Sequence, residues 1–196
     1  ELVNSGHQVL GIDSDERVVQ SLSGDLTHVV SADTTDEETL KELGLADMDS
    51  AVVAIGADLE ASILTASLLL QLGVKQVWAK ANSASHGRIL TQIGVHHVIF
   101  PEYEMGRRVA HQVSGESLDY VHIDDDFVMV KTYVPEIYED KLLSEAKIRA
   151  TYGVTVVAQN DGTGYKPAFP ETVLRKGNTI VVAGPKGPLD QFCQLD

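Results

Sequence analysis

The sequence predicts an α/β fold, a doubly wound parallel sheet followed by a small α+β domain. Short apolar strands recur at intervals of roughly 20 to 25 residues with helical segments between them, the spacing of strand–helix units in a Rossmann-like parallel sheet. After about residue 115 the pattern changes to strand, helix and then further strands, as in a compact α+β module. The strands predicted for the first part are Val9–Ile12, Val29–Val30, Ala51–Ile55, Val77–Ala81 and Val98–Phe100.

Helix signals lie in most of the intervals between these strands. Thr35-Asp36-Glu37-Glu38 has the form of a capping box, with Thr35 as the cap, and Gly44 ends the helix that follows. Asp58 is placed to cap a long helix that ends at Gly73. Two more helices are predicted, from Ala84 to Ile93 and from about Tyr103 to Ser114-Gly115.

The second part reads as a separate small domain. Nearly continuous apolar runs at Val154–Ala158 and Thr179–Ala183 predict central strands, and Asn160–Gly164 predicts a turn. A helical stripe runs through Leu142, Leu143, Ala146 and Ile148. We place the boundary near residues 115–119, which predicts a nucleotide-binding domain over 1–116 and a second domain over 117–196.

Composition excludes several classes of function. Lys plus Arg number 15 against 29 Asp plus Glu, a formal net charge of −14 that argues against non-specific binding to nucleic acid or to an anionic membrane. No apolar run approaches the roughly 18 residues that a membrane span needs. The single Cys193 excludes an internal disulfide and a cysteine-rich metal site, which fits a reducing, cytoplasmic setting.

The strongest candidate for a binding residue is Asp13, where the first predicted strand ends and a short helix opens at Ser14. An acid at the tip of the second strand of such a sheet hydrogen-bonds the hydroxyls of a ribose. The alternative is that Asp13 caps the helix that follows. The strand and glycine-rich phosphate turn that precede such an acid are absent from the sequence, and we expect that the chain is truncated at its start.

Other candidates follow the later strands. Asp33 and Thr34 are expected beside Asp13 at the carboxyl edge of the sheet, where adenine lies. Gly56 directly follows a strand, which either lets a ligand approach the backbone or serves a turn. Lys80 either faces phosphates or is a solvated strand end, and Glu102 suits phosphates chiefly with a bridging Mg²⁺ or Ca²⁺.

Signatures of catalysis are missing. The seven His residues do not have the spacing of a metal site, and no Gly-x-Ser-x-Gly elbow or Tyr-x-x-x-Lys pair is present. The sequence therefore predicts a protein that binds a nucleotide and is not an enzyme.

Six segments recur in a characteristic order along the chain: His7–Asp13, Ala32–Glu37, Val53–Ala57, Val98–Glu102, Ile148–Val154 and Leu174–Thr179. Together they resemble the RCK (KTN) regulatory subunits of bacterial potassium transporters, of the KtrA/TrkA type. The likeness covers nearly the whole chain, and the last two segments are similar to the small carboxyl-terminal TrkA-C (RCK-C) domain of that family.

The resemblance implies ligands and roles for particular residues. Such subunits bind ATP, ADP or NAD(H) in the first domain, and some bind cyclic di-AMP in the second. By this likeness, Asp13 and Ser14 bind the ribose, and Asp33 and Thr34 lie on the adenine side. The residues near the ligand are Ile55, Gly56, Ala57 and Lys80. Glu102 helps to hold a divalent cation, and Arg149 binds a phosphate in the second domain.

The resemblance also implies partners. It predicts homodimers that assemble into a ring, an octamer, at the inner face of the cell membrane, where nucleotides gate a potassium-translocating membrane subunit. Val109 and Val113 belong either to a subunit interface or to the core. Two alternatives remain: a fragment of an NAD(P)-dependent oxidoreductase whose catalytic residues lie outside this chain, and the cytoplasmic RCK tail of a potassium channel polypeptide.

Overall fold

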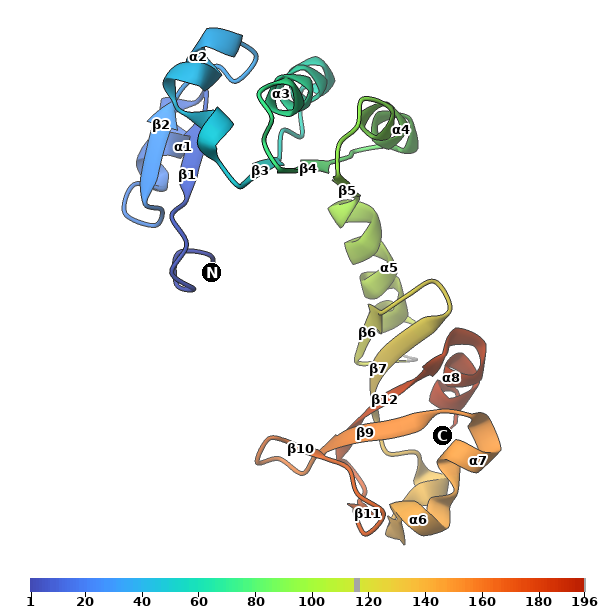
Figure 1. Ribbon diagram of the computed structural model, residues 1–196. Helices are drawn as coiled ribbons and strands as arrows, with labels where there is room; N and C mark the ends of the chain where they lie inside the picture. Colours follow the sequence, from blue (N-terminus) through green and yellow to red (C-terminus); the bar gives the residue numbers. More distant parts are fainter. Residues whose placement is uncertain (115–116, 196) are drawn as a thin grey trace. The chain divides into compact units, whose positions relative to one another are not determined.

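The computed structural model describes residues 1–114 and 117–195 (Figure 1). Packing divides the chain into two compact units, Glu1–Glu102 and Tyr103–Asp196. The last helix of the first part is expected to end at Ser114-Gly115, and Gly115 lies outside the described residues. The expected domain boundary also falls there, because residue 116 is not described. The division into 1–116 and 117–196 therefore stays a prediction.

Parallel strands form the frame of the first unit. β1 (Leu10–Asp13) pairs with β2 (His28–Ser31), and a second sheet has the order β3 (Ser50–Val53), β4 (Gln76–Lys80), β5 (His97–Ile99). In the doubly wound order 3-2-1-4-5-6, the pair supplies the first two places and the triplet the last three. Within residues 1–114 and 117–195, the β1-β2 pair and the β3-β4-β5 triplet are not hydrogen-bonded to each other.

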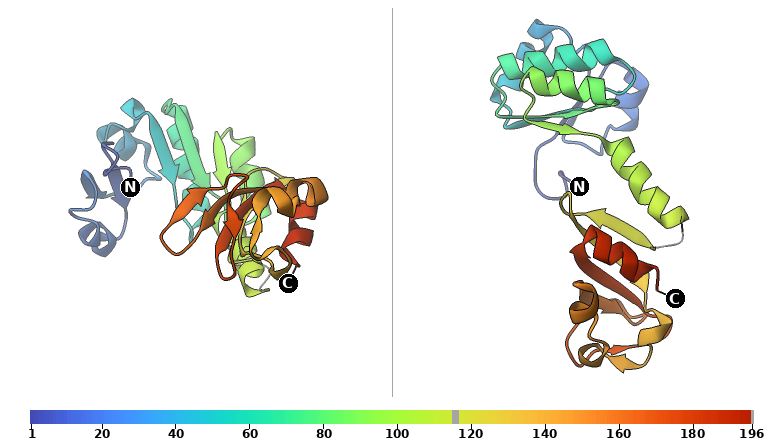
Figure 2. Two further views of the ribbon diagram at one scale, coloured as in Figure 1. Left: turned by 90° about the horizontal axis from the view of Figure 1, so that it is seen from below. Right: turned by 90° about the vertical axis from the view of Figure 1, so that its right-hand side faces the viewer.

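Helices cover one face of the β3-β4-β5 sheet. The long helices α3 (Leu59–Gln71) and α4 (Ala84–Gln92) lie side by side on that face (Figure 2). Leu69, Val77 and Leu90 are buried between helices and sheet, so the core of this unit lies there. On the opposite face Val52 keeps 64% of its surface exposed. The remaining helices are α1 (Glu16–Ser21), α2 (Glu37–Glu42) and the 3₁₀ turn η1 (Leu45–Asp47).

Capping explains where these helices begin. Asp58 accepts a hydrogen bond from the Ala61 N–H at 2.9 Å, so its predicted role as the cap of α3 is confirmed. The prediction that Thr35 caps α2 is wrong. Asp36 is the cap, because its carboxylate accepts from the Thr39 N–H at 3.0 Å, whereas the Thr35 N–H donates to Asp33.

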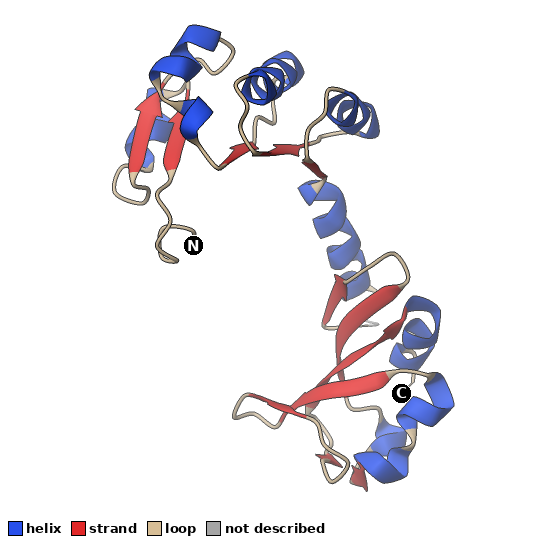
Figure 3. Ribbon diagram, in the orientation of Figure 1, coloured by secondary structure: helices blue, strands red, loops and turns tan. Residues whose placement is uncertain are grey.

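The second unit contains an antiparallel sheet in the order β10-β9-β12-β7-β6 (Figure 3). β12 pairs with β7 on one side and β9 on the other, and β9 also pairs with β10. This confirms that the runs at 154–158 and 179–183 form strands inside the sheet. Asn160–Gly164 connects β9 to β10, as predicted. The strands are β6 (Asp119–His122), β7 (Phe127–Tyr133), β9 (Thr155–Asn160), β10 (Tyr165–Pro167) and β12 (Thr179–Pro185).

Short helices complete this unit. α8 (Lys186–Cys193) packs on β12 and β7, where Leu189 and Phe192 are buried. The helical stripe expected through 142–148 is divided into α6 (Leu143–Ala146) and α7 (Ile148–Tyr152), because Lys147 between them has a left-handed φ of 50°. The other elements are α5 (Pro101–Val113), the 3₁₀ turn η2 (Glu136–Tyr138), β8 (Lys141–Leu142) and β11 (Val173–Leu174). Across residues 1–114 and 117–195, every helix is too short or too polar to cross a membrane.

Candidate functional site

Asp13 ends β1, at the carboxyl edge of the parallel pair. Its carboxylate accepts a hydrogen bond from the Asp15 N–H at 2.9 Å. Asp15 in turn caps α1 by accepting from the Arg17 N–H, so the helix begins at Glu16 and not at Ser14. The cap of α1 is therefore Asp15, and the alternative role of Asp13 as that cap is wrong. The exposed Ser14 lies directly beside this carboxylate in the chain.

The loop after β2 carries Asp33 and Thr34. The Thr35 hydroxyl and N–H donate to the Asp33 carboxylate at 2.7 and 2.9 Å, and these bonds hold the pKa of that carboxyl below its usual range. The Thr34 hydroxyl lies 2.8 Å from the hydroxyl of Thr65, a buried residue of α3. Sequence reasoning missed this anchor, although Thr65 was visible as a polar interruption of an apolar helix.

Lys80, Glu102 and Gly56 come together at the ends of β3, β4 and β5. Lys80 forms an ion pair with Glu102, and its Nζ would lie 3.3 Å from a Cβ built on Gly56. Hydrogen bonding to Lys80 lowers the pKa of the Glu102 carboxyl. Gly56 itself is exposed, between the half-buried Ile55 and the exposed Ala57. The cation, the carboxylate and the exposed backbone thus share one edge.

Asn82 also belongs to this edge, and sequence reasoning missed it. It lies two residues beyond the end of β4, and its side-chain amide donates to the carbonyl oxygen of Gly56. The only sequence signal is its place just after a strand, in the same stretch as Lys80.

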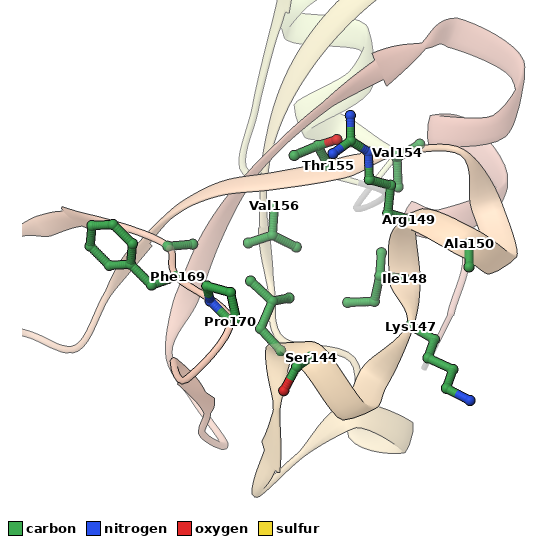
Figure 4. A pocket seen from close by; sticks show the side chains of 12 residues that line it. Ser144, Lys147, Ile148, Arg149, Ala150, Val154, Thr155, Val156, Phe169 and Pro170 are labelled. Atoms are coloured by element: carbon green, nitrogen blue, oxygen red, sulfur yellow. The ribbon is translucent and has the colours of Figure 1, made fainter.

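Arg149 belongs to the second unit, whereas the other candidate residues belong to the first. It is exposed on α7 and lines a pocket with a volume of about 490 Å³. Its side chain extends beside Thr155, with Phe169 and Pro170 across the pocket, whereas Lys147 points away from them (Figure 4). The lining residues are Leu143, Ser144, Lys147, Ile148, Arg149, Ala150, Val154, Thr155, Val156, Ala168, Phe169 and Pro170.

The chemistry available at the first-unit edge is that of binding. Carboxylates at strand ends accept hydrogen bonds from hydroxyls, a lysine offers a charge to phosphate oxygens, and Glu102 offers hard oxygen ligands to a divalent cation. Within residues 1–114 and 117–195, His, Cys, Asp and Glu do not gather in groups of three or more that would hold a metal by themselves.

Comparison with known proteins finds one family domain in each part of the chain. A TrkA-N domain matches residues 1–101, and a TrkA-C domain matches residues 127–195. Ktr system potassium uptake protein A of Bacillus subtilis (strain 168) is 33% identical over 194 residues, which cover 98% of this chain and 87% of that protein. Ktr system potassium uptake protein A of Vibrio alginolyticus is 37% identical over 191 residues, covering 96% and 87%.

A solved structure agrees with the fold. The GsuK channel bound to NAD superposes with a TM-score of 0.67 at 19% identity, covering 96% of this chain and 35% of the channel chain. The predicted fold class, a Rossmann-like domain followed by a small α+β domain, is thereby confirmed, as is the resemblance drawn from the sequence. The chain belongs to the family that joins a TrkA-N domain to a TrkA-C domain, together with the Ktr system potassium uptake proteins.

Proposed function

We propose that this chain is a nucleotide-sensing regulatory subunit that gates a potassium-translocating membrane protein, and that it is not an enzyme. The observation that carries the proposal is the cluster of Lys80, Glu102 and the exposed Gly56 at the carboxyl edge of a parallel sheet. Ligands of doubly wound sheets bind at that edge. Two relatives that match most of the chain are named potassium uptake proteins, and GsuK, which has the same fold, has been solved with NAD.

The roles we assign follow the order of the strands. Asp13 and Ser14 hold the ribose hydroxyls, and Asp33 and Thr34 face the adenine. The backbone of Ile55, Gly56 and Ala57 lies against the nucleotide, and Lys80 neutralises phosphate charge. The ligand is ATP, ADP or NAD(H).

A divalent cation fits the position of Glu102. Its exposed carboxylate offers oxygen ligands, and Mg²⁺ bound to nucleotides commonly takes one or two carboxylates together with phosphate oxygens. Glu102 would offer its carboxylate oxygens to Mg²⁺ or Ca²⁺ bound with the nucleotide, and Lys80 would offer its charge to a phosphate oxygen.

Gating requires that the nucleotide prefers one assembly state. We propose a homodimer that builds an octameric ring at the inner face of the cell membrane, bound to the membrane subunit. A ligand shifts such an equilibrium only by its difference in affinity for the two states. ATP, ADP and NAD(H) therefore act through different affinities for two ring geometries.

Cyclic di-AMP is the ligand we propose for the pocket of the second unit. The pocket has a volume of about 490 Å³, which falls in the usual range for small-molecule sites, roughly 300 to 1,000 Å³. Arg149 supplies a cation for a phosphate, and the ring of Phe169 supplies an apolar wall on the other side.

Thermal melting tests the proposal for the first unit. ATP, ADP or NADH at 100 times its dissociation constant should stabilise the protein by about 2.7 kcal/mol. Asp13→Ala should lose this shift, whereas Asp25→Ala, which removes an exposed carboxylate elsewhere in the same unit, should keep it. If none of these nucleotides raises the melting temperature, the sensing function is wrong.

The oxidoreductase alternative is tested with the same protein. A fragment of such an enzyme would belong with relatives that turn over a hydride donor, whereas two relatives that match nearly all of this chain are uptake proteins. We expect NADH to be bound and not consumed, measured by its absorbance in the presence of candidate carbonyl substrates.

A further inference from the structure

The turn after β3 is held by a bond from a neighbouring loop. The side-chain amide of Asn82 donates to the carbonyl oxygen of Gly56, 26 residues earlier in the chain. Since β3 and β4 are adjacent parallel strands, this bond joins two loops at the edge where the nucleotide is proposed to lie. Asn82 is exposed to solvent, so packing does not hold its side chain, and the bond requires that another residue holds the Asn82 backbone in place.

His86 fixes the backbone of Asn82. The Asn82 N–H donates to Nδ1 of His86 at 3.4 Å, and His86 lies in the first turn of α4 with only 1% of its surface exposed. The His86 N–H in turn donates to the hydroxyl of Ser83, the cap of α4, at 3.1 Å. Next to it, Gly87 packs so closely on Phe100 that an added Cβ would clash with Cζ of the ring. Little space is left for this helix end to move.

The state of the imidazole shows what it contributes. Because Nδ1 accepts from Asn82, the proton of the neutral ring lies on Nε2. Nε2 is buried and makes no hydrogen bond within the described part of the chain, and burial lowers the pKa of His86. A buried donor without a partner destabilises the fold. An aliphatic side chain would remove that cost, but it would also remove the acceptor for Asn82.

We propose that Asn82 and His86 are positioning residues of the nucleotide edge: Asn82 fixes the Gly56 carbonyl, and His86 fixes Asn82. The turn after β3 is then ordered before the ligand arrives, and a preordered site binds more tightly because less freedom is lost on binding. The inference rests on the proposed function for its ligand.

The test compares ADP binding by isothermal titration calorimetry in the wild type and in matched variants. Losing a single hydrogen bond that orders the turn should weaken binding about five- to tenfold in Asn82→Ala and His86→Leu. His86→Asn should stay within about twofold of the wild type, since its side-chain oxygen can take the place of Nδ1. Gln92→Ala, an exposed amide at the other end of α4, is the control and should bind as the wild type does.

A second measurement needs no nucleotide. The Ala57 amide belongs to the peptide group whose carbonyl Asn82 holds, so its ¹H–¹⁵N resonance should move in Asn82→Ala and stay in place in Gln92→Ala. An unmoved Ala57 resonance with ADP affinity within twofold of the wild type would overturn the positioning role. If the wild type binds no nucleotide, the proposed function fails, and the Ala57 resonance alone decides whether Asn82 orders the turn.

Discussion

At the scale of single residues, the ion pair with Lys80 affects how the Glu102 carboxyl titrates. The pKa of Glu102 is held down by its bond to Lys80, so the pair stabilises the fold above the ordinary pKa of a glutamate. That stabilisation is lost as the pH falls through the lower, folded-state pKa. We expect Lys80→Met to move the pKa of Glu102 up to the ordinary range, measured by NMR titration of its carboxyl carbon.

Lys75→Met is the matched control for this titration. Lys75 pairs with Asp49 at 2.7 Å and lowers the pKa of that carboxyl, so its removal should raise the pKa of Asp49 and leave Glu102 unchanged. A Glu102 pKa that stays depressed without Lys80 would show that another group sets it.

Glu102 carries a second prediction, about cations. If Glu102 bridges a divalent cation to the nucleotide phosphates, adding Mg²⁺ or Ca²⁺ should strengthen ATP binding by the wild type. Glu102→Gln keeps the shape of the side chain but loses the charge, so the cation should then have little effect. Calorimetric titrations with and without the cation measure this, and Glu104→Gln on the same helix should behave as the wild type does.

How far single residues could be predicted depends on whether their role is local. Asp13, Lys80 and Glu102 carry charges at strand ends, so the sequence alone marks them as candidates. Asn82 and Thr65 act through partners 26 and 31 residues away, at Gly56 and Thr34. Such contacts exist only once the strands are assembled, and no local pattern encodes them.

At the scale of elements, local capping chemistry predicts helices well but locates their ends less well. The sequence offers two acceptors at Thr35-Asp36, and the choice of Asp36 depends on where the chain leaves β2. The break between α6 and α7 had no signal in the apolar stripe. It comes from the left-handed backbone of Lys147, a conformation that sequence favours mainly at glycine and asparagine.

Substituting alanine for each of two helical glycines should change the stability of the protein in opposite directions. Gly87 in α4 faces Phe100 at a distance that leaves no room for a methyl group, so Gly87→Ala should destabilise the protein by about 1–3 kcal/mol, less the helix propensity gained. Gly106 in α5 has open space where its Cβ would be, so Gly106→Ala should stabilise by about 0.5–1 kcal/mol. Urea unfolding measures both, and equal changes in the two variants would contradict the packing against Phe100.

At the scale of the whole molecule, the order of the two units follows from spacing along the chain. Strand–helix repeats predict a parallel sheet because each crossover is local. The antiparallel sheet of the second unit was predicted only as a set of strands, because its register joins residues as distant as Phe127 and Pro185. Assembly into dimers and a ring is harder to predict from the sequence, because a single chain does not show which of its exposed surfaces a partner covers.

Helix α5 offers an apolar surface for the proposed dimer. The sequence left open whether Val109 and Val113 belong to the core or to an interface. In the structure both lie on α5, where 44% of the surface of Val109 and 81% of that of Val113 is exposed. Met105, Val109 and Val113 recur every four residues, so they form one apolar stripe along the helix. If the proposed homodimer covers this stripe, Val113→Asp should bury an unpaired charge and weaken dimerisation, measured by sedimentation velocity. Val18→Asp, on exposed α1, should leave the dimer intact, and a Val113→Asp protein that still sediments as the wild type does would place the interface on another surface.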